Sequence, residues 1–185
     1  KIRGYHGKAL VFLAAAWCFE RIGMGFGGAW PPALFILSNQ LFLVAIVAML
    51  LWTLLRHRDS DGYRRDNVFF LLLLPLFPLS KFLLLDGHWS QAGQTMALGL
   101  FRLAFLIMLE RTLTEFMKGV FQAAILRHPL LDGSIKALAL LLAFAGFLPP
   151  LATAGLAAVL ALLLLARFAF WQPRLAFTRL DIGIM

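Results

Sequence analysis

Long apolar segments, separated by short polar or Gly/Pro-rich connections, constrain this chain more than any other feature. About six such segments fit into its 185 residues, and 62% of all residues are hydrophobic, whereas a soluble domain is near one half. A helix of roughly 20 apolar residues is long enough to cross the hydrocarbon core of a bilayer. The pattern therefore predicts an all-α polytopic transmembrane bundle of about six spanning helices in contact with lipid.

Turn and helix-start signals define the expected helices. The Gly-rich stretch 25–32 ends in two prolines, and Pro149 and Pro150 interrupt the last long apolar run. Pro75 and Pro78 lie inside one segment and predict a kinked helix whose freed carbonyls are satisfied by its neighbours. The expected helices cover residues 8–25, 33–55, 67–85, 92–118, 134–148 and 151–170.

Lys and Arg residues occupy alternate connections, which predicts the topology. The positive connections are the N-terminal flank (Lys1, Arg3, Lys8), the second connection (Arg56, Arg58, Arg64, Arg65), the fourth (Lys118, Arg127, Lys136) and the tail (Arg167, Arg174, Arg179). The remaining connections carry no Lys or Arg. Because positive loops stay in the cytoplasm, both ends are expected there, as in the cytoplasmic membrane of a bacterium.

The net charge of +8 is thereby assigned to cytoplasmic loops rather than to nucleic-acid binding. No RNA-binding module and no Gly-rich phosphate loop is present. The single cysteine, Cys18, excludes an internal disulfide. Because the chain begins at Lys1, without a signal peptide, we expect residues 1–185 to be one transmembrane domain from inside a longer polytopic protein.

Ionisable residues inside the apolar segments are the first candidate site. With the predicted topology, Glu20, Arg21 and Lys81 lie toward the outer face, and Arg102 lies roughly 15 Å below the outer start of its helix. A charge in the bilayer needs a partner or water, and Arg102 cannot easily lose its proton. Glu20 is the best-placed carboxylate, so we expect Glu20 to offset Arg102. The group is either an ion pair that orients helices or a site for an anion, a proton or another ligand.

A second charged group, Glu110, Arg111, Glu115 and Lys118, falls at the expected cytoplasmic end of the same helix as Arg102. Arg111 and Glu115 are four residues apart and share one helix face. We expect this group to be an ordinary interfacial charge cluster. No nucleophile accompanied by a base is evident, so the sequence gives no indication of an enzyme.

Potential metal ligands are scattered. The four histidines, His6, His57, His88 and His128, lie in flanks or connections and share no helical spacing. Cys18 and Met24 offer soft donors for Cu(I), and His88 is the one histidine expected on the outer side. These residues are weak candidates, and membrane packing is the alternative role. Three adjacent polar residues, 38–40, interrupt the second helix, and at least one of them should bond to another helix.

Four segments, taken in order, are similar to one known family. "AAAWCFERIGM" resembles the W-x-x-x-R opening of a middle helix in the NnrS family, and "RRDNVFFLLLLPLFPLSKFLLL" resembles the entry to its next span. "LGLFRLAFLIMLERTLTEFMKGVF" is similar to the helix that ends in a Gly-Arg-x-x-Pro-x-Phe-type motif, and "FWQPRLAFTRLDIGIM" to its Trp-x-Pro stretch. The residues that match these motifs are Arg21, Arg111 and Phe116. Glu110 replaces the motif's glycine, and its proline is missing.

The resemblance implies a role in tolerance of nitric oxide and nitrosative stress, together with haem or copper. It also implies that the metal ligands lie mainly outside this chain, since none of the matched residues is a metal ligand. Two other functions stay open on the residues themselves. One is a transporter or channel that uses Glu20, Lys81 and Arg102, and the other is a scaffold that packs against remaining helices of the same protein or against partner membrane subunits.

Overall fold

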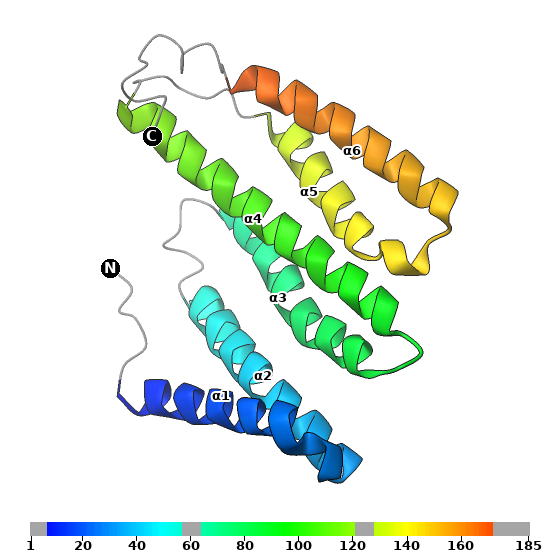
Figure 1. Ribbon diagram of the computed structural model, residues 1–185. Helices are drawn as coiled ribbons and strands as arrows, with labels where there is room; N and C mark the ends of the chain where they lie inside the picture. The colour runs from blue at the N-terminus through cyan, green and yellow to red at the C-terminus, as the bar shows by residue number, and fades with distance from the viewer. Residues whose placement is uncertain (1–6, 57–63, 121–127, 172–185) are drawn as a thin grey trace. The chain divides into compact units, whose positions relative to one another are not determined.

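The computed structural model describes residues 7–56, 64–120 and 128–171, and all regular structure in these ranges is helical (Figure 1). The elements are α1 (Lys8–Phe26), the 3₁₀ turn η1 (Gly27–Ala29), α2 (Pro32–Arg56), α3 (Arg64–Leu85), α4 (Ser90–Val120), α5 (Pro129–Ala143), the 3₁₀ turn η2 (Ala145–Phe147) and α6 (Pro150–Phe170). The predicted all-α fold is confirmed. Pro32, Pro129 and Pro150 each begin a helix, where the missing N–H has no helical partner to lose.

Five of the helices, all except α5, are long and apolar enough to cross a membrane. The 15 residues of α5 extend about 22 Å, which is less than the roughly 30 Å of a hydrocarbon core. The prediction for this helix, 134–148, was wrong at both ends, because the helix begins at Pro129 and stops at Ala143 before η2. The cytoplasmic location of both chain ends stays a prediction.

The α-carbon contacts divide the chain into two compact units, which are described separately. Unit 1 is Lys1–Ala97 and unit 2 is Leu98–Met185. The division falls inside α4, which is a continuous helix of 31 residues. The expectation of a single transmembrane domain stays a prediction.

In unit 1, α1 packs against α2, and α2 packs against α3. Glycines make two of the helix contacts close. A Cβ atom on Gly23 of α1 would collide with the Ser38 side chain of α2. A Cβ atom on Gly93 of α4 would lie 2.5 Å from the backbone nitrogen of Leu84 in α3. Small residues allow such close backbone approach in membrane bundles, where dispersion contacts replace the hydrophobic effect between helices.

Unit 2 holds the rest of α4 together with α5 and α6, and α5 packs against α6. Gly99 of α4 lies against Ala143 at the end of α5, with an added Cβ only 2.6 Å from the Ala143 Cα. Many apolar side chains of α6 remain on the outside, among them Leu151, which is 87% exposed, and Leu162, which is 67% exposed. Apolar surface of this kind is consistent with contact to lipid acyl chains.

Candidate functional site

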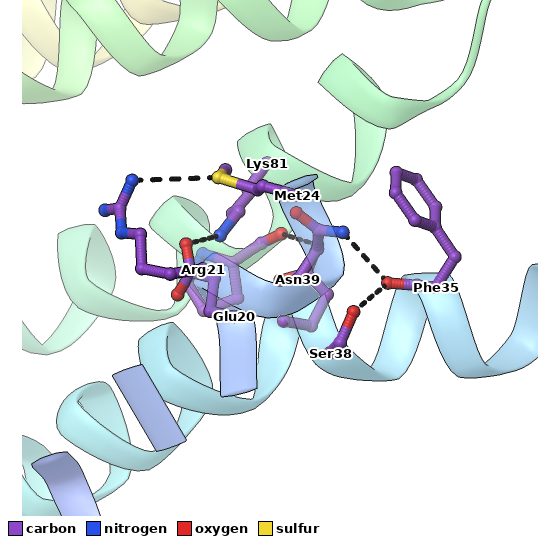
Figure 2. Close-up of polar contacts among 9 residues, drawn as sticks. Glu20, Arg21, Met24, Phe35, Ser38, Asn39 and Lys81 are labelled. Atoms are coloured by element: carbon purple, nitrogen blue, oxygen red, sulfur yellow. Dashed lines mark hydrogen bonds and ion pairs between the residues drawn. The ribbon is translucent and has the colours of Figure 1, made fainter. Parts of the chain in front are cut away.

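A buried ion pair joins α1 to α3 in unit 1. The ammonium nitrogen of Lys81 lies 2.6 Å from Oε1 of Glu20, and both side chains are largely buried (Figure 2). Glu20 is only 4% exposed. A lone carboxylate at such a position would be costly to remove from water, so the ammonium group of Lys81 is what makes it tolerable.

Within unit 1 the structure gives Glu20 a partner that differs from the expected one, and the pairing of Glu20 with Arg102, which would join the two units, stays a prediction. The partner in unit 1 is Lys81. Arg102 belongs to unit 2, is exposed, and forms no ion pair with another described residue of that unit. Arg21 also stands apart from the pair: its side chain is exposed, its guanidinium lies 5.5 Å from the ring centre of Trp17, and its Nη1 donates to the sulfur of Met24 at 3.7 Å (Figure 2).

The polar residues of α2 lie beside this pair and divide into two roles. Ser38 and Asn39 are buried, and both donate to the carbonyl of Phe35 in their own helix, at 2.8 Å and 3.0 Å (Figure 2). Gln40 instead reaches another helix, because its Nε2 donates to the Pro78 carbonyl of α3 at 3.3 Å. The expectation that at least one of the three bonds to another helix is therefore confirmed by Gln40 alone.

Two buried oxygen atoms of unit 1 have no hydrogen-bond donor within the part of the chain that the structure describes. They are Oε2 of Glu20 and Oε1 of Gln40. Buried acceptors normally have a partner, and the exceptions call for an explanation such as a bound water, an ion or a function. We call Glu20, Gln40, Lys81 and the Pro78 carbonyl the polar layer of unit 1.

Unit 2 contains a larger buried charge network on α4, α5 and α6. The two carboxylate oxygens of Glu110 lie 2.9 Å from Nζ of Lys136 and 2.9 Å from Nη2 of Arg167. Nη1 of Arg167 also lies 3.2 Å from Oδ1 of Asp132. Two acidic and two basic side chains thus balance one another. Their side chains are between 3% and 12% exposed, so water screens them little.

The Glu110 network corrects the expectation of an ordinary interfacial cluster. Glu110 is 4% exposed, whereas Arg111 is half-buried and Glu115 and Lys118 are exposed. Lys136 and Arg167 lie inside α5 and α6. The assignment of Lys and Arg residues to connections had counted both of them among the connecting segments. The sequence held one usable signal: Asp132 and Lys136 are four residues apart, which puts an acid and a base on one face of a helix.

The sequence model described as NnrS protein matches residues 1–184. The chain belongs to the NnrS family. The predicted resemblance is therefore confirmed over almost the whole sequence. Neither the curated proteins nor the solved structures gave a match to the chain.

The residues matched to NnrS motifs lie apart from the buried pairs. Arg21 is exposed on α1, while Arg111 and Phe116 lie on α4, half-buried and 44% exposed respectively. Glu110, which lies next to Arg111, is the residue that organises the buried network. Its carboxylate is bound by cations of α5 and α6.

The soft-metal donors of this NnrS chain do not fit a haem or copper site as the structure places them. Cys18 is exposed, and Met24, six residues further along α1, points about 120° away around the helix. The sulfur of Met24 accepts from Arg21, and the exposed His88 packs edge-on against Trp89 at 4.9 Å. No group of three or more His, Cys, Asp or Glu residues suited to a metal occurs in the described ranges.

Proposed function

We propose that this chain is part of an integral membrane protein that acts in the response to nitric oxide and nitrosative stress. The observation that carries the proposal is the match of the NnrS family across residues 1–184. The five long apolar helices support a location in a membrane, and the bacterial inner membrane is the location that we infer.

The proposal assigns haem or copper to residues outside this chain. Iron in haem and copper are held by His, Cys or Met donors that converge on the metal. Cys18, Met24 and His88 do not converge, and the buried charged groups of the described residues are carboxylate, ammonium and guanidinium groups. The chain would contribute the helical body against which the metal-bearing helices, or partner membrane subunits, pack.

The visible spectrum of the complete protein, purified in detergent, tests this function. We expect a Soret band that shifts on reduction, or copper, with metal in a fixed ratio to protein. A matched variant, Cys18→Ser, should keep both spectrum and metal content, because this thiol is exposed and has no converging donors. A folded protein without haem and copper would contradict the proposal.

Transport through unit 1 is the second candidate, and the buried Glu20–Lys81 pair with one carboxylate oxygen lacking a donor favours it. If Glu20 carries protons, Glu20→Gln should abolish proton flux across liposomes that contain the complete protein, followed with a pH-sensitive dye. The variant should also remain folded. If the pair instead has a scaffold role, the same substitution should lower expression and thermal stability. Neither the wild-type protein nor the variant should then show flux.

A further inference from the structure

A cleft of about 320 Å³ lies between the beginning of α2 and the end of α3 in unit 1. This volume falls at the lower end of the range for small-molecule sites, roughly 300–1,000 Å³. Apolar side chains and a single carboxylate line the cleft: Pro32, Phe35, Ile36, Phe82, Leu85 and Asp86. We propose that the cleft binds a phospholipid with an ammonium headgroup, phosphatidylethanolamine, which places its ammonium group on Asp86 and an acyl chain along the apolar walls.

The cleft lies where the two helices end, at the level of the membrane surface. Pro32 is the first residue of α2 and Leu85 is the last of α3, and both helices are long and apolar enough to cross a membrane. Trp30 and Trp89 stand in the connections at these same helix ends. Tryptophan is enriched at the depth of the lipid headgroups. A phospholipid beside this end of unit 1 therefore has its headgroup at the depth of Asp86.

Polar and apolar groups of the cleft follow one another in the order that an amphiphile requires. Asp86 comes directly after α3 and is exposed, so its carboxylate can meet a headgroup. Ile36 and Phe82 lie four and three residues inside their helix ends, which is about 4–6 Å deeper along the helix axes. Their side chains are 38% and 50% exposed, so an acyl chain that enters from the bilayer can contact both.

The Asp86 carboxylate lacks a cation to balance its charge. Its Oδ1 accepts from the backbone N–H of His88 at 3.1 Å, and it forms no ion pair with another residue that the structure describes. The ring of His88 lies edge-on against Trp89. Lys81 of the polar layer, the cation of α3 nearest to Asp86 in sequence, is bound to Glu20. An ammonium headgroup supplies both the missing charge and N–H donors, whereas a lipid whose only charge is its phosphate would be repelled.

Two other occupants fit the lining less well. A metal cation needs several oxygen ligands, about six for Mg²⁺, and Asp86 is the one lining side chain that carries oxygen. A small hydrophilic amine would use the carboxylate and leave the apolar walls uncovered. The rings of Phe35 and Phe82 suit a lipid, because aromatic rings offer a large apolar surface to methylene groups and their faces attract an ammonium group.

This inference does not rest on the nitric oxide role, and the phospholipids that the complete protein retains test it separately. The protein in detergent is mixed with equal amounts of dioleoyl phosphatidylethanolamine and dioleoyl phosphatidylglycerol, and the bound lipids are identified by native mass spectrometry. Because the acyl chains are the same, a preference reports the headgroup. We expect preferential retention of phosphatidylethanolamine. Asp86→Asn should weaken its binding about tenfold, as the loss of a charge-assisted hydrogen bond predicts, and Glu115→Gln, which removes an exposed acid of α4, should not.

Filling the cleft gives a second test that keeps every charge. Ile36→Trp enlarges a lining side chain and should lower the retention of phosphatidylethanolamine. Leu37→Trp is the matched control, because this exposed residue is the next one along α2 and lies outside the lining. Equal effects of the two tryptophans overturn the proposal, as does a lipid preference that Asp86→Asn leaves intact.

The lipid assignment has its own contradicting results. Equal retention of the two phospholipids would show that the headgroup is not recognised. Displacement of the bound lipid by an equal amount of ethanolamine would show that the cleft takes a free amine instead. A complete protein that retains neither phospholipid overturns the proposal as well, as when another of its helices fills the cleft.

Discussion

Replacing Glu110 with glutamine is expected to destabilise the protein by about 3–5 kcal/mol, the range observed when one partner of a buried ion pair is removed. Both carboxylate oxygens of Glu110 are used, one by Lys136 and one by Arg167, each at 2.9 Å. Without the carboxylate, Asp132 remains the only acid of the network, and the buried charge rises from zero to +1. Glutamine offers one acceptor oxygen and an amide that cannot donate to either cation.

The free energy of unfolding in mixed detergent micelles measures this effect. Glu115→Gln is the matched control, because it makes the same chemical change at an exposed position of the same helix and should cost less than about 1 kcal/mol. Adding Lys136→Met to Glu110→Gln restores charge balance and should recover part of the loss. Equal stabilities of the Glu110 and Glu115 variants would show that the network contributes nothing to the fold.

The helices were predictable wherever a strong local signal limits a long apolar run. Pro32 and Pro150 begin α2 and α6 within a residue of the expected positions, because proline is tolerated in the first helical turn and not in the interior. The same rule applies to Pro129, which begins α5. That start was missed because the five residues after it include Asp132 and Gly133, which resemble a loop when charge and hydropathy alone are considered.

The partners of the buried charges were less predictable, because depth in the membrane does not determine rotation about a helix axis. Depth placed Glu20 and Lys81 in the same outer half of the membrane, and only the packing of α1, α2 and α3 in unit 1 makes them partners. Glu110 shows the same limit. Its partners lie 26 and 57 residues further along the chain, and no local pattern connects them to it.

Gly93→Ala is expected to destabilise the protein by about 1–3 kcal/mol, the usual cost of forcing an extra methyl group into a filled space. An added Cβ would lie 2.5 Å from the nitrogen of Leu84, 2.8 Å from the carbonyl carbon of Leu83 and 2.8 Å from the carbonyl oxygen of Ser80. All three atoms belong to the backbone of α3. Since a helix backbone cannot rotate away as a side chain does, α3 and α4 must move apart.

Gly119→Ala provides the matched control, because it adds the same methyl group to the same helix. Among the residues that the structure describes, none has an atom within 4 Å of a Cβ at Gly119, so alanine meets open space there. Replacing a glycine in the last turn of α4 should then stabilise by up to about 0.5–1 kcal/mol, through the smaller entropy of the unfolded chain. The two substitutions should therefore change the free energy of unfolding in opposite directions. If both stabilise to the same extent, the close approach of Gly93 to α3 does not exist in the folded protein.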